Sequence, residues 1–191
     1  MKGINIFLAD GFEDIEALAV NDVLVRGGLK PRLITISDDP FVVSSHGVTI
    51  GSDLFLSDIE IKHEGTAKQD IMILPGGMPG SKNLAACRPL IKALKEHYAA
   101  GGTLAAICAA PGLVLGQLDI WEGRTFTCFN GFEALPVSKG GCFKDCPAVT
   151  DGQVITGRSA GNAIAFGLEI LARVKGEDAV ANVRAGLYPT L

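Results

Sequence analysis

Cys108 is the residue whose position best suits chemistry. It follows the apolar run Thr103-Leu-Ala-Ala-Ile107 and precedes Ala109-Ala-Pro111, which is typical of a helix start. A thiol at such a strand-to-helix turn lies near free N–H groups and the positive end of the helix dipole, which favour its thiolate. The same turn can bind the oxyanion of an intermediate. Cysteine is also a common inert core residue, so the pattern alone leaves both readings open.

Two other segments are expected to meet this thiol. The apolar run 4–9 leads into Asp10-Gly-Phe-Glu-Asp-Ile-Glu16, and the run 71–74 leads into Pro75-Gly76-Gly77. Ligands of doubly wound sheets bind outside the carboxyl ends of the strands, so these segments should converge with Cys108. Glu16 could face the thiol or only solvate its own helix turn. The glycine turn could donate N–H groups to an anion or be a simple turn, and it lacks the lysine of a phosphate-binding loop.

The elements that must position these residues alternate along the chain. Apolar spacing predicts helices from Ile15 to the stop at Gly27-Gly28, over about 90–100, after Cys108 and over 160–174. A hairpin is predicted around Ser44–Gly47, between strands 41–43 and 48–50. The other predicted strands are 4–9, 30–37, 71–74, 103–107, 125–128, 148–150 and 153–156. This alternation indicates an α/β fold with a mostly parallel sheet between helices.

Composition and charge limit the function. With 191 residues and 48% hydrophobic content, the chain can bury one sizeable core and is expected to form one domain. Its 17 basic and 21 acidic side chains give a formal charge of -4 without a basic stripe, which argues against nucleic acid. No apolar run approaches the roughly 20 residues of a membrane span, and the first run is too short for a signal peptide. We therefore expect a cytoplasmic protein without a membrane partner.

The five cysteines are expected to be free thiols. They lie at 87, 108, 128, 142 and 146, an odd number without the spacing of a secreted disulfide framework. Cys128, Cys142 and Cys146 offer three sulfur ligands, but a structural zinc site normally needs four and no nearby histidine completes the set. We therefore expect no metal site, and interpret these three as incidental or redox-active thiols.

Five segments stand out in order along the chain: Leu8–Glu16, Leu74–Gly77, Ala105–Ala109, Thr127–Glu133 and Thr156–Arg158. Together they closely resemble the ThiJ/PfpI superfamily over nearly the whole chain. Within that superfamily, the best fit is the branch of Parkinson disease protein 7. The resemblance implies a flavodoxin-like, doubly wound fold with a nucleophile-elbow cysteine, and a single class I glutamine amidotransferase-like domain over 1–191.

The resemblance also implies roles for individual residues. Glu16 would be protonated and hydrogen-bonded to the Cys108 thiolate, while Gly77 and Ala109 would donate backbone N–H groups to a substrate oxygen. A carboxylate beside a thiolate repels it, so one proton shared by the pair is physically reasonable and predicts a thiol of low pKa. Arg26 and Arg158 match basic positions near the pocket and the dimer interface; the alternative is that they are ordinary surface or carboxylate-paired arginines.

The sequence departs from the family pattern at two positions. Where many relatives have histidine or tyrosine followed by proline, this chain has Cys128-Phe129-Asn130, so Phe129 occupies the position and no imidazole is available for a Cys–His dyad. His46 stands where relatives often carry an arginine beside the pocket. It could be a pocket cation or a solvated residue of the hairpin turn. His63 and His97 are predicted to lie at the surface.

The leading hypothesis is a cofactor-independent, Cys108-dependent enzyme for reactive carbonyl compounds, of the glyoxalase III or protein deglycase type. Its substrate would be a small aldehyde or a glycated molecule. The family pattern suggests a homodimer, with Ser44–Ile50 as a contact. The alternative is a non-enzymatic oxidative-stress sensor or redox chaperone in which Cys108 becomes a sulfinic acid. A peptidase or other hydrolase is a weaker alternative, because the imidazole partner is missing.

Overall fold

A seven-stranded sheet forms the centre of the computed structural model, which describes residues 1–59 and 64–188. The strand order is β10-β11-β7-β6-β1-β2-β5, and every neighbouring pair is parallel except β10 and β11. The parallel strands therefore end at one edge, where β1, β6 and β7 lead into Asp10, Pro75 and Cys108. The strands are β1 (Ile4–Leu8), β2 (Arg32–Thr35), β5 (Leu54–Phe55), β6 (Ile71–Leu74), β7 (Thr103–Ile107), β10 (Ala148–Asp151) and β11 (Val154–Gly157).

Strands β1, β6 and β7 are apolar throughout, apart from Asn5 and Thr103, because helices cover both faces of the sheet. Every residue in these three strands is buried. Successive side chains of a strand point to opposite faces. Accordingly, Ile6 and Leu8 belong to one hydrophobic cluster, whereas Phe7 and Ala9 belong to the other. The continuous apolar runs of the sequence thus correspond to strands buried on both sides.

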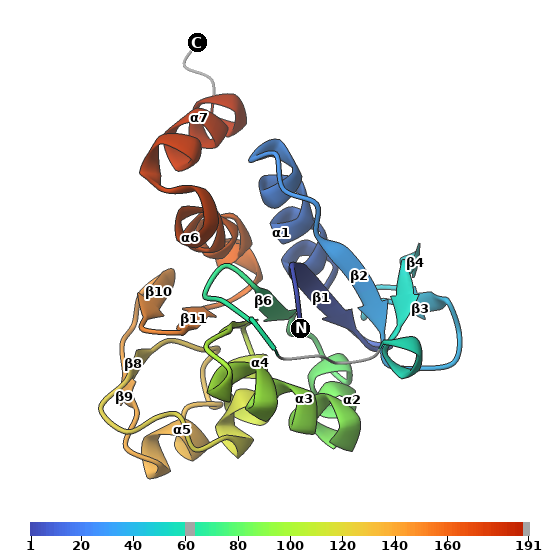
Figure 1. Ribbon diagram of the computed structural model, residues 1–191. Helices are drawn as coiled ribbons and strands as arrows, with labels where there is room; N and C mark the ends of the chain where they lie inside the picture. Colours follow the sequence, from blue (N-terminus) through green and yellow to red (C-terminus); the bar gives the residue numbers. More distant parts are fainter. Residues whose placement is uncertain (60–63, 189–191) are drawn as a thin grey trace.

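The helices form a layer on each face of the sheet (Figure 1). One layer holds α1 (Asp14–Arg26), α6 (Ala163–Lys175) and α7 (Glu177–Leu187), with Leu24 and Phe166 in its core. The other holds α2 (Gly80–Ala86), α3 (Arg88–Ala99) and α4 (Ala110–Leu113), with Leu94 and Val114 in its core. Within the described ranges, no helix is both long enough and apolar enough to cross a bilayer.

Two small sheets lie outside the main one. Strands β3 (Phe41–Val43) and β4 (Thr49–Gly51) form an antiparallel hairpin, which confirms the hairpin predicted from the sequence. Strands β8 (Thr125–Phe126) and β9 (Cys142–Phe143) pair in parallel, with α5 (Ala134–Ser138) between them in the chain. The hairpin is joined to the loop after β1, since Gly11 N–H donates to Val43 O at 2.8 Å.

The α/β class and the mostly parallel sheet are confirmed, but two element predictions were wrong. The strand predicted over 125–128 is only β8, because Thr127 N–H turns to the Thr156 hydroxyl at 2.9 Å instead of continuing a strand ladder. The predicted last helix is followed by α7. Gly176, with φ 84°, interrupts the helix, and Glu177 and Asp178 favour a new helix start.

Candidate active site

Cys108 occupies a tight turn between β7 and α4. Its φ of 64° lies in the left-handed region, and no other described residue except glycine has a positive φ. This conformation costs a residue with a Cβ roughly 1–3 kcal/mol. The turn is held on both sides, because Cys108 N–H donates to Gly157 O at 3.0 Å and Phe129 N–H donates to Cys108 O at 2.8 Å. The backbone therefore forms the predicted nucleophile elbow, with the thiol half-buried.

The glycine turn after β6 brings the other site residues to this elbow. A Cβ on Gly76 would lie 2.4 Å from Glu16 Oε2 and 2.6 Å from Cys108 Cβ, so only glycine fits between them. Gly77 has φ 89°, and a Cβ there would lie 2.4 Å from Glu13 N. Glu13 N–H also donates to Gly76 O at 3.1 Å. The turn is therefore packed directly between the start of α1 and the elbow.

Glu16 is a carboxyl group buried in the first turn of α1. It is 1% exposed, and its Oε2 accepts a hydrogen bond from Gly76 N–H at 2.7 Å. Its other oxygen, Oε1, is buried and has no hydrogen-bond partner among residues 1–59 and 64–188. A buried polar atom of this kind is costly, which makes Oε1 a candidate for proton exchange with a bound molecule.

Glu16 and Cys108 form an electrostatically coupled pair. Burial raises the pKa of Glu16 to about 7, against the lowering effects of the Cys108 thiol and Gly76 N–H. Burial also raises the pKa of Cys108 to about 12, and the Glu16 charge adds to that rise. The N–H groups of Ala109 and Gly77 act in the opposite direction and favour the thiolate. The pair therefore loses its first proton near neutral pH, shares the remaining one above that, and loses it only at far higher pH.

The direction of this shift is opposite to the low thiol pKa expected from the sequence. Ala109 of the elbow and Gly77 of the glycine turn each supply one N–H group to the sulfur. Their effect is smaller than the desolvation of the thiol and the charge of the adjacent carboxylate, both of which disfavour a second negative charge. Near neutral pH, the Cys108 thiol is thus one member of a singly protonated pair and cannot be treated as an isolated thiolate.

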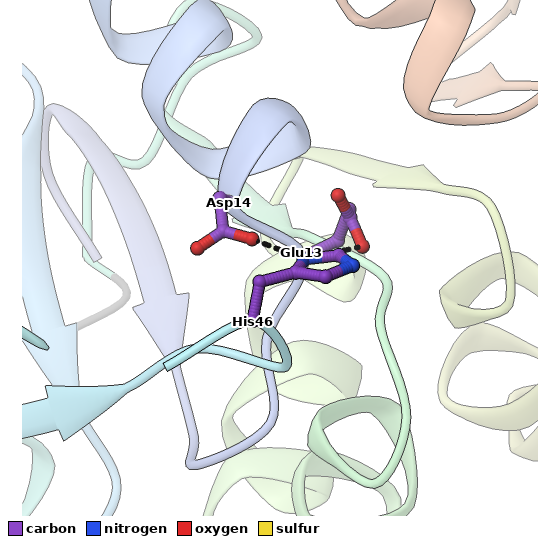
Figure 2. A group of neighbouring side chains, drawn as sticks. All are labelled: Glu13, Asp14 and His46. Carbon is purple, nitrogen blue, oxygen red and sulfur yellow. Dashed lines mark hydrogen bonds and ion pairs between the residues drawn. The ribbon is translucent and has the colours of Figure 1, made fainter. Parts of the chain in front are cut away.

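His46 lies at the tip of the β3–β4 hairpin, against the start of α1. Figure 2 shows its imidazole facing both carboxylates, with Nδ1 at 2.5 Å from Asp14 Oδ2 and 3.8 Å from Glu13 Oε2. The side chain is 65% exposed, and the hydrogen bond to Asp14 raises the pKa of His46. Glu13, Asp14 and His46 each offer one atom that could bind a metal, and these three atoms lie within 4.8 Å of one another. The imidazole already pairs with these carboxylates, so His46 fixes the hairpin to α1 as an ion-paired turn residue.

Arg158 organises the loop that carries Phe129. It donates to Cys128 O, to Asn130 Oδ1 and to Asp145 Oδ1, the last at 2.9 Å, and its guanidinium lies 5.3 Å from the centre of the Phe143 ring. Phe129 itself is half-exposed and packs beside Phe132. Of the two roles left open for Arg158, a carboxylate-paired structural role thus has direct support, and its contacts extend to the segment bonded to the elbow.

Several predicted residues lie away from the elbow. Arg26 ends α1 and pairs with Asp22 at 2.6 Å, ten residues beyond Glu16 and hence about 15 Å along the helix. It therefore does not reach the pocket. The surface prediction for His97 was wrong: the ring is fully buried, with Nε2 at 3.0 Å from Asp70 O. His63 lies outside the described residues. All five cysteines are free.

Gly76 is the site residue that sequence reasoning missed. It was noted only as part of a turn, yet its N–H binds the Glu16 carboxyl and its missing side chain allows that carboxyl to reach Cys108. The available signal was its place directly after an apolar strand and before a second glycine. Sequence alone could not show which of the two glycines touches the carboxyl.

Comparison with known proteins gives consistent similarities. A sequence profile described as "DJ-1/PfpI family" matches residues 2–173. Protein DJ-1 homolog B of Arabidopsis thaliana is 31% identical over 97% of this chain, which spans only 41% of that protein. The chain therefore covers less than half of this plant relative. The glutathione-independent glyoxalase DJR-1.2 of Caenorhabditis elegans is 34% identical over 87% of this chain and 84% of its own length.

Solved structures share the same fold. A DJ-1 superfamily protein from Salmonella typhimurium superimposes with a TM-score of 0.85 at 32% identity, with all of both chains covered. DJ-1beta of Drosophila melanogaster gives a TM-score of 0.84 at 30% identity over 97% of each chain. The similarity therefore extends through the whole sheet and both helical layers.

Proposed function

The chain belongs to the DJ-1/PfpI family, and on that basis we propose that it is a cofactor-independent, cysteine-dependent enzyme that acts on reactive carbonyl compounds. The observation that carries this proposal is the contact of a buried carboxyl with a thiol at a strained elbow. A relative named as a glutathione-independent glyoxalase supports the choice of reaction. The substrate class is a small α-oxoaldehyde or the adduct that such an aldehyde forms with an amine.

The first step is attack of the Cys108 sulfur on the aldehyde carbon. Glu16, as carboxylate, takes the thiol proton while the carbon–sulfur bond forms, because a carboxyl with a pKa of about 7 is a good base near neutral pH. Glu16 then gives that proton to the aldehyde oxygen, which becomes the hydroxyl of a hemithioacetal, and Glu16 is again a carboxylate. The N–H groups of Gly77 and Ala109, which favour negative charge at this position, stabilise that oxygen.

The second step moves a proton between adjacent carbons. Glu16 removes the proton from the former aldehyde carbon, which gives an enediolate with its charge on the neighbouring oxygen. The hydroxyl proton of the hemithioacetal moves to that oxygen, and Glu16 returns its own proton to the neighbouring carbon. The first carbon is thereby oxidised and the second reduced, so no external oxidant is needed. Water then cleaves the resulting thioester, which releases a 2-hydroxy acid and restores the Cys108 thiol.

The test is turnover of methylglyoxal by the reduced protein without glutathione. We expect many equivalents of lactate per protein, with a loss of at least about 10³-fold in Cys108→Ser and about 10²–10⁴-fold in Glu16→Gln. Cys142→Ser, which removes an exposed thiol elsewhere, is the matched control and should retain full activity. Unchanged lactate production by Cys108→Ser would refute the proposal.

A non-enzymatic redox sensor is the second candidate, because the half-buried Cys108 thiol lies beside a carboxyl that can hydrogen-bond an oxidised sulfur. This reading predicts less than one equivalent of lactate. It also predicts a stoichiometric mass gain of two oxygen atoms at Cys108 after treatment with peroxide. Turnover and stoichiometry thus separate the two functions.

We also propose that the protein forms a homodimer through α1 and the β3–β4 hairpin. Ile15, Leu18 and Val25 are exposed along α1, and Phe41 and Val43 are exposed on the hairpin. Apolar side chains gathered on adjacent elements favour an interface. Light scattering should give twice the chain mass, and Leu18→Glu should shift the protein to monomer.

Five free thiols fit a reducing compartment, which supports the cytoplasm as the location.

A further inference from the structure

A cavity of about 490 Å³ lies in the helical layer on the opposite face of the sheet from α1. It is formed by the end of α2, the outer face of α3 and the single-turn helix η2 (Leu115–Gln117), and no residue of the Cys108 elbow lines it. Its volume is within the range of sites that bind small molecules. The proposed carbonyl chemistry makes no use of it.

The cavity combines an apolar wall with a basic rim. Ala85 and Ile91 provide apolar surface, and both pack against the core. Arg88, Lys92 and Lys95 are the basic residues of the lining, and Glu96 is its one acidic residue among those the structure describes. Together with Ile91, they occupy positions i, i+3, i+4 and i+7 of α3, which share one helix face. Their exposed side chains therefore surround the apolar wall.

The basic charge around this cavity is only partly balanced. Lys92 lies 3.8 Å from Glu96, its carboxylate partner one turn later. Across the described part of the chain, neither Arg88 nor Lys95 forms an ion pair, and Asp119, the acid near Lys95, pairs with Lys139 at 2.8 Å. Two cations are thus available on a protein whose formal net charge is -4.

The start of α3 adds to this positive potential. The helix begins at Arg88 with no acidic residue in its first turn and no side-chain cap on its N–H groups. By contrast, α1 has Asp14 and Glu16 in its first turn, and α7 has Glu177 and Asp178. The positive end of the α3 dipole is therefore not compensated, and it lies at the cavity beside Arg88.

We propose that this cavity is a binding site for a small amphipathic carboxylate: an apolar body on Ala85 and Ile91, and a carboxylate held by Arg88 and Lys95. Arg88 can bind the carboxylate through two parallel N–H groups, and Lys95, two turns further along the same face of α3, adds a second positive charge. An apolar ligand without charge would leave both cations unused. An inorganic anion would leave the apolar wall exposed to water.

The test is an NMR titration of the full-length protein with 4-phenylbutyrate, with its neutral amide as the matched probe. Amide signals of residues 85–96 and Gln117 should shift, with a Kd on the order of 1 mM at low salt. The neutral amide should bind at least about fivefold more weakly, and added salt should weaken only the carboxylate. Equal binding of both probes, or shifts elsewhere on the surface, would overturn the proposal.

Variants separate the cavity from general surface charge. Arg88→Gln/Lys95→Gln should weaken 4-phenylbutyrate at least about tenfold, whereas Lys30→Gln/Lys175→Gln removes the same charge elsewhere and should change the Kd less than twofold. Ala85→Leu keeps every charge but fills the cavity, and should also abolish binding. Retained affinity in either cavity variant, with the native fold confirmed by its spectrum, would contradict the site. Lactate turnover should be unaffected by these changes, since none of the substituted residues belongs to the Cys108 site, so the two proposals can fail independently.

Discussion

Cys108 and Cys128 both follow a strand, yet they differ in exposure, backbone conformation and neighbouring groups. Burial raises the pKa of each thiol to about 12. Cys128 is completely buried and packs in the core. Cys108 is half-buried, its φ is 64°, and its sulfur lies beside Glu16 and two backbone N–H groups. Burial is therefore common to both, and the reactive character we propose for Cys108 comes from its turn.

The backbone explains why this difference is maintained. The left-handed conformation at Cys108 is unfavourable on its own, and the hydrogen bonds to Gly157 and from Phe129 hold it in place. Phe129 is also the residue after Cys128, so the two regions are in direct contact. The loop of Cys128, fixed by Arg158, thus serves as part of the support for the Cys108 elbow.

Alkylation should show the largest difference between these thiols. With iodoacetamide at pH 8, we expect Cys108 to react at least about 100-fold faster than Cys128, because it is more exposed and Glu16 can accept its proton. Peptide mass spectrometry over time measures both rates in one sample. Exposed Cys142 serves as the reference for an ordinary thiol. Similar rates for Cys108 and Cys128 would remove the distinction drawn here.

Gly76→Ala should damage the Cys108 region almost as strongly. The added methyl group would lie within 2.6 Å of both Glu16 Oε2 and Cys108 Cβ, so the pair must separate. We expect a loss of about 10²-fold in kcat/KM and of about 1–3 kcal/mol in the free energy of unfolding. Gly161→Ala, where a Cβ meets nothing within 4 Å, is the control. Full activity in Gly76→Ala would show that the contact is not needed.

The pH dependence of Cys108 should carry the signature of its carboxyl partner. The pair gains its reactive, singly ionised form as the pH rises through the Glu16 pKa of about 7. Below that pH, the alkylation rate should therefore fall about tenfold per pH unit, and above it the rate should level off. In Glu16→Gln, this rise of the alkylation rate up to pH 7 should be absent. A wild-type profile without an inflection near pH 7 would contradict the coupling.

The same ionisation should also affect stability. The pKa of Glu16 rises from 4.5 when unfolded to about 7 in the fold, so the folded state binds more protons between these values. Stability is therefore greatest below pH 4.5 for this group and decreases by about 3 kcal/mol as the pH rises through 7. Glu16→Gln lacks this loss, and denaturant unfolding at several pH values measures the difference. If the free energies of unfolding of wild type and Glu16→Gln changed in parallel with pH, this contribution of Glu16 would be excluded.

The sequence was most informative for residues whose position follows directly from the end of a predicted strand or the start of a predicted helix. Apolar runs and helix spacing located β1, β6, β7 and α1, and thus placed Glu16, Gly77 and Cys108 at one edge. It could not give the sign of the Cys108 pKa shift, which depends on how desolvation compares with two N–H groups. It also could not show that His46 turns to Asp14, because that contact joins residues 32 apart. Both results depend on distances that only the folded chain defines.

Substitution of Cys128 should have the smallest effect on activity, and it completes the comparison of Cys128 with Cys108. Cys128→Ala removes a fully buried sulfur from the core, which should lower the free energy of unfolding by about 1–2 kcal/mol. Its carbonyl, which accepts from Arg158, is retained, so the loop and the elbow should keep their positions. We therefore expect kcat/KM for methylglyoxal within about twofold of wild type, measured beside urea unfolding. A loss of activity as large as in Cys108→Ser would mean that Cys128 takes part in the reaction, and that the two strand ends form one site.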